Sequence, residues 1–241
     1  MCTEDVPANP PEASDAASTG LALQAVLFDM DGTLVDTEPY WMAAEYALVE
    51  SFGGTWSDER AHALVGNALL TSAEYIRLHG QVTLDPPVIV ERLVDEVARA
   101  AKDVMPWRPG AVALLTELRA RNVPCAMVTM SYARLAQAVV DALAPGTFDV
   151  VVTGDQVLDG KPHPEAYLTA AARLGVELNR CVAIEDSPTG IASAEAAGCV
   201  VVAIPHAVAV APGPSRTIVG SLTELTVDQL DRLVRLRALT P

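Results

Sequence analysis

The sequence predicts an α/β protein: a doubly wound, parallel, Rossmann-like sheet with an inserted all-helical domain. Short apolar runs rich in Val and Ala alternate with segments of helical periodicity, the pattern of strands and crossover helices in a parallel sheet. Roughly 93 residues separate the first two runs, far more than one crossover helix needs. Asp29 and Asp31 directly follow the first run, at the strand end where such sheets bind ligands.

Six apolar runs are predicted strands. They are LQAVLFD (23–29), VPCAMVT (123–129), FDVVVTG (148–154), RCVAIED (180–186), CVVVAIP (199–205) and TIVG (217–220). Between and after the later strands, helical periodicity predicts helices at about 132–143, 163–174, 188–197 and 226–238. This order of elements predicts helices on both faces of one sheet.

The long segment between the first two strands is predicted to be helical. From Trp41 to Phe52 the apolar residues fall on one helical face, which stops at Gly53-Gly54. Thr71 and Glu74 have the spacing of a capping box, for a helix that would end at Gly80. Asp85-Pro86 predicts the start of a third helix with an apolar stripe.

These elements predict two domains. The core comprises residues 21–37 and 106–241, and a helical cap occupies 38–105. Residues 1–20 contain acids but no Lys or Arg, and no long apolar run follows them. We therefore expect a disordered leader, and neither a signal peptide nor a membrane anchor.

Net charge and the length of the apolar runs argue against nucleic-acid and membrane partners, and cysteine spacing indicates the redox state. A formal net charge of -15 argues against a sequence-independent grip on nucleic acid or on an anionic membrane. No run reaches the ~18 apolar residues of a membrane helix. The four cysteines lack metal-ligand spacing, which indicates reduced thiols and a cytoplasmic protein. We expect a monomer or a weak homo-oligomer.

Polar side chains follow four of the predicted strands, and the carboxyl ends of parallel strands meet at one edge of the sheet. These residues are Asp29, Asp31, Thr129, Ser131, Lys161, Glu185 and Asp186. Clustered carboxylates need a cation, and oxygen-only ligands favour Mg²⁺. A lysine and a hydroxyl suit phosphate oxygens, so the set predicts a phosphoryl-binding site.

Four motifs carry a resemblance to a known family. They are DMDGTLVDTE (29–38), VTMS (128–131), GKPHPEAY (160–167) and IEDSPTGIASAEAAG (184–198). In order and spacing they resemble the haloacid dehalogenase (HAD) superfamily, in its phosphatase and β-phosphoglucomutase-like branch. The resemblance implies a HAD core with a helical cap, and a Mg²⁺-dependent enzyme acting on a small phosphorylated metabolite.

The resemblance also implies a role for each matching residue. Asp29 would be the nucleophile that becomes an aspartyl phosphate, and Asp31 the general acid and base. Thr129, Ser131 and Lys161 would bind the phosphoryl oxygens. The metal ligands would be Asp29, the backbone carbonyl of Asp31, Asp186, and Glu185 either directly or through water. In the cap, the loop at Gly66 and Asn67 would face the substrate.

Other polar residues carry structural expectations. Asp36 and Glu38 are expected to cap the first cap helix or to orient the hinge, and not to act in catalysis. The four histidines, which are His62, His79, His163 and His206, form no ligand pattern and are expected to be solvated or in the core.

Three functions are compatible with these motifs. The leading hypothesis is a Mg²⁺-dependent phosphatase of a sugar or polyol phosphate. A β-phosphoglucomutase-like sugar phosphomutase shares the core motifs, but Trp41 stands where that mutase has a histidine, and no basic residue follows Gly66 directly. A non-catalytic phosphometabolite-binding protein would be expected to have lost at least one of four residues, all of which are present: Asp29, Asp31, Lys161 and Asp186. Haloacid dehalogenation is disfavoured, because that reaction does not use the second aspartate of the motif, which is present here as Asp31.

Overall fold

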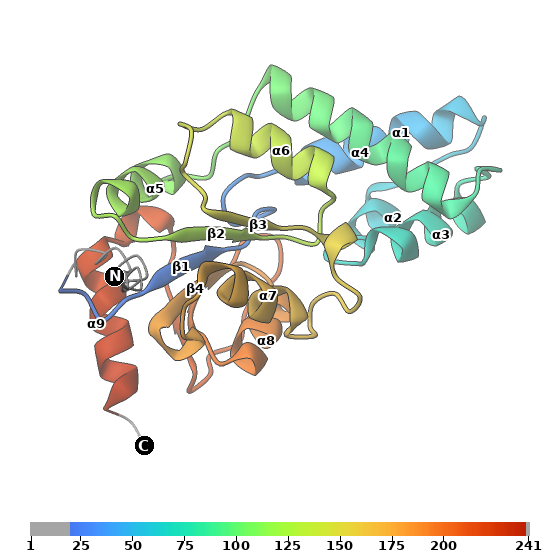
Figure 1. Ribbon diagram of the computed structural model, residues 1–241. Coiled ribbons are helices and arrows are strands. Elements are labelled where there is room, and N and C mark those ends of the chain that lie inside the picture. Colours follow the sequence, from blue (N-terminus) through green and yellow to red (C-terminus); the bar gives the residue numbers. More distant parts are fainter. Residues whose placement is uncertain (1–19, 240–241) are drawn as a thin grey trace, which may run out of the picture.

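The computed structural model describes residues 20–239, so the predicted leader lies outside the described residues except for its last position. Six parallel strands form one sheet in the order β3-β2-β1-β4-β5-β6, with helices on both faces (Figure 1). The strand order reverses between β1 and β4, which is the switch point where open parallel sheets bind ligands. The predicted fold class is confirmed.

The strands lie within the predicted apolar runs or overlap them. They are β1 (Ala25–Phe28), β2 (Cys125–Val128), β3 (Val150–Val152), β4 (Cys181–Glu185), β5 (Val200–Ala203) and β6 (Arg216–Ile218). The helices that follow the cap are α5 (Ala111–Ala120), α6 (Ala133–Asp141), α7 (Glu165–Leu174), α8 (Pro188–Ala197) and α9 (Val227–Ala238). Of these, only α5 has no counterpart among the predicted helices.

The sheet is buried on both faces, because successive residues of a strand point to opposite sides. In β1, Val26 and Phe28 join the cluster that contains side chains of α5, α6 and α9. Ala25 and Leu27 join the cluster formed with α7 and α8. This two-sided burial explains why the strands read as continuous apolar runs.

Four helices lie in the segment predicted to be the cap: α1 (Glu38–Ser51), α2 (Asp58–His62), α3 (Leu69–His79) and α4 (Pro86–Asp103). The predicted capping box is wrong. Helix α3 begins at Leu69, two residues before Thr71, and Glu74 pairs with Arg77 instead of capping. The short helix α2 was not predicted, because five residues are too few to establish a period.

The chain leaves and re-enters the core at adjacent positions. Val35 and Trp107 form an antiparallel bridge, the amide of Asp36 donates to the carbonyl of Pro106, and the amide of Arg108 donates to that of Leu34. These crossings coincide with the boundaries that we propose between core and cap. We call these paired linkers, residues 34–36 and 106–108, the hinge.

Two further observations concern membrane-spanning helices and cysteines. Within residues 20–239, no helix combines the length and apolar character needed to cross a membrane. The cysteines of this part of the chain, Cys125, Cys181 and Cys199, are free and buried. Burial raises the pKa of the Cys125 thiol to about 12, which leaves it protonated and unreactive at neutral pH.

The carboxyl group of Glu45 is buried in the cap. Its side chain accepts a hydrogen bond from Trp56 Nε1 at 3.2 Å. Burial raises the pKa of Glu45 from 4.5 to about 7, because the single hydrogen bond does not replace the lost water. The pKa is higher in the folded chain than in the unfolded one, so stability is lost as pH rises from the unfolded to the folded pKa.

We therefore expect Glu45→Gln to stabilise the protein by about 3 kcal/mol at pH 8 but by only about 1 kcal/mol at pH 5. The amide keeps an acceptor for Trp56 and removes the charge. Urea unfolding at the two pH values measures the difference, with Glu50→Gln, at an exposed position of the same helix, as the control. An equal effect at both pH values would contradict the assignment.

Candidate active site

Lys161 lies at the centre of a buried cluster at the carboxyl ends of β1, β2 and β4. Its Nζ donates to Asp29 Oδ1 at 2.7 Å, to Glu185 Oε1 at 2.6 Å and to the carbonyl of Val128 at 2.8 Å. Only 5% of the Lys161 side chain is exposed, against 10% for Asp29 and 0% for Glu185. The strand ends therefore bring together one lysine and two carboxyl groups that are shielded from water.

The charge state of this cluster follows from its burial. Burial alone would lower the pKa of Lys161, but Asp29 and Glu185 outweigh it and hold that pKa above its ordinary value. For Asp29 the larger effect is burial, which raises its pKa well above the usual range, while Lys161 acts in the opposite direction. Lys161 is therefore charged. Among residues 20–239, it is the cation that pairs with Asp29 and Glu185.

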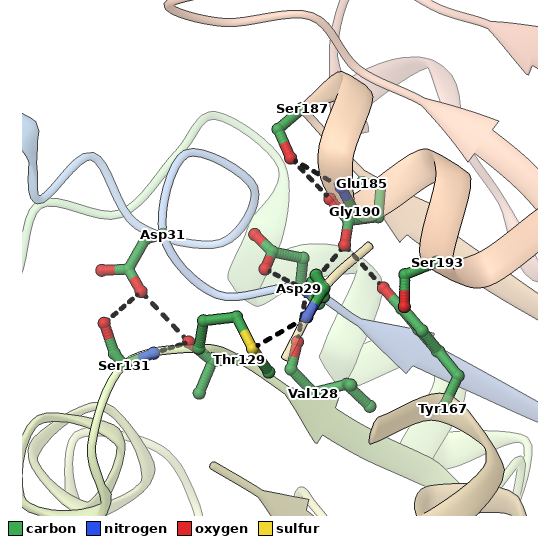
Figure 2. Close-up of polar contacts among 12 residues, drawn as sticks. Asp29, Asp31, Val128, Thr129, Ser131, Tyr167, Glu185, Ser187, Gly190 and Ser193 are labelled. Carbon is green, nitrogen blue, oxygen red and sulfur yellow. Dashed lines mark hydrogen bonds and ion pairs between the residues drawn. The ribbon is translucent and has the colours of Figure 1, made fainter. Parts of the chain in front are cut away.

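Asp31 lies apart from this cluster and is held by three hydroxyl groups. Thr37 Oγ1 donates to its Oδ1 at 2.6 Å, and Ser131 Oγ and Thr129 Oγ1 donate to its Oδ2 at 2.7 and 3.2 Å. Figure 2 shows the two groups: Asp31 with Thr129 and Ser131, and Asp29 beside Glu185. The two aspartates thus have different hydrogen-bond partners.

The arrangement has the features of a cation site. Asp29 Oδ2 is buried and has no hydrogen-bond partner. Asp29, Glu185 and Asp186 each offer a ligand atom, and these atoms lie within 4.8 Å of one another. Lys161 and Tyr167 both donate to Glu185 Oε1, whereas Oε2 accepts one longer hydrogen bond, from Ser187 Oγ at 3.4 Å. An orphaned carboxylate oxygen among other carboxylates fits a hard divalent ion.

Two glycines make room for these carboxylates. A Cβ at Gly32, whose φ is +85°, would lie 2.1 Å from Asp186 Oδ2. A Cβ at Gly190 would lie 2.0 Å from Glu185 Oε1. The first turn of α8 is capped by Ser187, whose Oγ accepts from the amide of Gly190, so the carboxylates are not its cap.

The other predicted residues lie outside the cluster at the strand ends. Gly66 and Asn67 are exposed, and the Asn67 side chain donates to the carbonyl of Ala63 within the cap. The expectation that Asp36 caps α1 is wrong, because Thr37 precedes that helix without a side-chain cap bond. Asp36 lies 3.0 Å from His206, and its alternative role of orienting the hinge stays a prediction. The His206 ring therefore lies against a residue that borders the cap.

Sequence reasoning assigned no role to Thr37 or Tyr167. Thr37 is 1% exposed and bonds Asp31, while the buried hydroxyl of Tyr167 donates to Glu185 at 2.7 Å. Both residues stand inside motifs quoted from the sequence, six positions after Asp31 and after Lys161 respectively. That spacing does not reveal which group a side chain bonds. Membership in a motif was therefore the one sequence signal that could have pointed to these two residues.

A switch-point site with a buried lysine, two separately held aspartates and a carboxylate cluster defines a phosphoryl-transfer class of protein. The family comparison agrees: residues 23–198 match the model for haloacid dehalogenase-like hydrolases. The chain belongs to this family. The resemblance to the HAD superfamily that the motifs indicated is confirmed. The predicted class, an enzyme that hydrolyses phosphoric monoesters, is confirmed as well.

Relatives in this family are similar over most of the chain. Hexitol phosphatase A from Escherichia coli is 35% identical over 190 residues, covering 74% of this chain and 81% of the relative. A phosphorylated carbohydrates phosphatase from Thermotoga maritima is 30% identical over 177 residues, covering 73% and 82%. A single-residue variant of CbbY from Rhodobacter sphaeroides, solved with xylulose-(1,5)bisphosphate, has a TM-score of 0.76 at 25% identity and covers 87% of this chain and 99% of its own.

Proposed function

We propose that the protein is a Mg²⁺-dependent phosphatase that hydrolyses a sugar or polyol phosphate through an aspartyl-phosphate intermediate. The observation that carries the proposal is the pairing of Asp29 with Lys161, which leaves Asp29 Oδ2 buried beside further carboxylates. A carboxylate in this position suits both attack on phosphorus and contact with a metal. Mg²⁺ would be held by Asp29, Asp186 and the Asp31 carbonyl, with Glu185 Oε2 bound directly or through water.

In the first step, a carboxylate oxygen of Asp29 attacks phosphorus, and the bond from phosphorus to the substrate oxygen breaks. Asp31 gives its proton to that leaving oxygen. Asp31 then takes a proton from water, whose oxygen attacks phosphorus and releases phosphate and free Asp29. Lys161 and the Thr129 and Ser131 hydroxyls would bind the phosphoryl oxygens. The metal, when bound, supplies positive charge that offsets the phosphate's negative charge.

Glu38 supports a hydroxylated substrate. Burial and the nearby Asp31 raise its pKa, and His62 and His206 are close enough to oppose that shift. A half-buried carboxylate close to Asp31 can accept hydrogen bonds from the hydroxyl groups of a sugar or polyol. The names of the two phosphatase relatives point to the same substrate class.

A substrate panel tests the proposal. The protein is incubated with Mg²⁺ and with sugar, polyol and nucleoside monophosphates and glycolate phosphate, and both free phosphate and isomerised product are measured. We expect phosphate without isomer from a sugar or polyol phosphate. Isomer formation that requires a bisphosphate would instead indicate a mutase, and binding without turnover would indicate a non-catalytic protein.

Asp31→Asn is expected to impair turnover of sugar phosphates by about 10²- to 10⁴-fold, since a poor leaving group needs the proton of Asp31. The loss should be smaller in the first step with p-nitrophenyl phosphate, whose leaving group needs no acid. We then expect a burst of p-nitrophenol and accumulation of phosphorylated protein, because the variant cannot deprotonate water. Normal steady-state turnover of a sugar phosphate would refute the acid-base role.

A further inference from the structure

One charged contact outside the proposed catalytic centre joins the cap to the core. Arg134, in the first turn of α6, makes ion pairs with Glu91 at 3.4 Å and with Asp95, both on the cap helix α4. Glu91 and Asp95 are four residues apart on one helical face, so their charges repel each other. The guanidinium between them provides the cation that this acidic face of α4 needs to approach α6.

The ion pairs lie on a packed interface. Helices α4 and α6 are in direct contact, and Figure 1 shows them side by side. Val94 of α4 and Leu135 and Val139 of α6 belong to the same hydrophobic cluster. The position of the cap on the core is therefore determined at this interface as well as at the hinge.

Helix α6 is connected directly to the residues that hold Asp31. It begins two residues after Ser131, whose hydroxyl donates to Asp31 at 2.7 Å. The Ser131 carbonyl accepts from the amide of Gly154 at 3.0 Å, and the amide of Ala133 donates to Asp155 at 3.2 Å. Ser131 and Ala133, on either side of Tyr132, are both hydrogen-bonded to residues 154–155. Because the loop is this short and bonded at both ends, a shift of the start of α6 also moves Ser131.

We propose that Arg134 is a positioning residue for Asp31. By pairing with Glu91 and Asp95 it holds α4 against α6, and the start of α6 holds Ser131 where its hydroxyl orients Asp31. The inference rests on the proposed function, because the orientation of Asp31 matters for turnover only if Asp31 transfers a proton.

Arg134→Gln tests the proposal, because glutamine keeps polarity and loses the charge. We expect kcat/KM for a sugar phosphate to fall about 3- to 10-fold, the size of effect that two exposed ion pairs support. With p-nitrophenyl phosphate the fall should be smaller, because its release needs no acid. High salt should bring the wild-type protein towards the variant, and Arg134→Asp combined with Asp95→Arg should restore much of the loss.

The control is Arg99→Gln, also on α4, because Arg99 pairs with Glu96 and Asp103 of its own helix. Wild-type kinetics in Arg134→Gln, or an equal loss with both substrates that the charge exchange does not restore, would overturn the proposal. Should the wild-type protein hydrolyse no ester, the proposed function fails and amide hydrogen exchange decides the present inference. Faster exchange over residues 129–135 in Arg134→Gln, and not in Arg99→Gln, supports the coupling, and unchanged exchange refutes it.

Discussion

Asp29→Asn is expected to abolish Mg²⁺-dependent phosphate release, with a loss of about 10⁴-fold or more in kcat. The amide has nearly the shape of the carboxylate and keeps an oxygen that can accept from Lys161. It is not a nucleophile towards phosphorus, so the covalent step is lost rather than slowed. Phosphate release from the best ester of the substrate panel measures the effect.

Stability separates this loss from misfolding. Burial raises the pKa of Asp29 well above its ordinary value, so its charge is costly in the folded state. Removing that charge leaves Lys161 paired with Glu185 and with the Val128 carbonyl. We expect the variant to unfold at a urea concentration no lower than the wild-type protein does. A folded Asp29→Asn variant with near wild-type kcat would make the nucleophile assignment wrong.

Asp36→Asn is the matched control for Asp29→Asn. It makes the same change seven residues later, in a side chain that pairs with His206 outside the lysine cluster. We expect kcat to stay within about twofold of the wild-type value, as for most substitutions at partly exposed positions. A large loss in this variant would instead indicate that the hinge contact controls turnover.

Most of the sheet could be predicted from the sequence because β1, β2, β4 and β5 are buried along their whole length and therefore read as uninterrupted apolar runs. The same reasoning failed in the cap. Five residues of α2 carry no period, and the start of α3 is decided by packing of Ala73 and Ile76 and not by the Thr71 side chain. Local capping patterns are weak signals when tertiary burial acts on the same helix.

The predicted site residues from the strand ends converge because sheet topology requires it. What the sequence did not reveal is how they pair. Lys161 was predicted from its motif, but the sequence did not reveal its contact with Glu185. Likewise, the three hydroxyls on Asp31 come from the strand β2 side and from the hinge, and no sequence period relates these two segments.

Lys161→Met should both abolish activity and destabilise the fold. Methionine fills the space of the lysine stem but leaves the buried carboxylates of Asp29 and Glu185 without a counter-charge. Breaking a buried ion pair from one side costs about 3–5 kcal/mol. The exposed Lys102, which is the other lysine of the chain, gives the matched control Lys102→Met, and this variant should leave activity and stability unchanged.

The destabilisation of Lys161→Met should depend on pH in a defined direction. Without the lysine, burial acts unopposed by Lys161 on the pKa of Asp29, which is already raised above its ordinary value, so the variant loses stability as pH increases. The deficit relative to the wild-type protein, measured by urea unfolding without Mg²⁺, should therefore be larger at pH 8 than at pH 5. Adding Glu185→Gln removes one of the uncompensated charges and keeps an acceptor for Tyr167, so it should recover stability without recovering activity. If the double variant regained turnover, Lys161 would serve only to neutralise Glu185, and its proposed role on the phosphoryl group would be wrong.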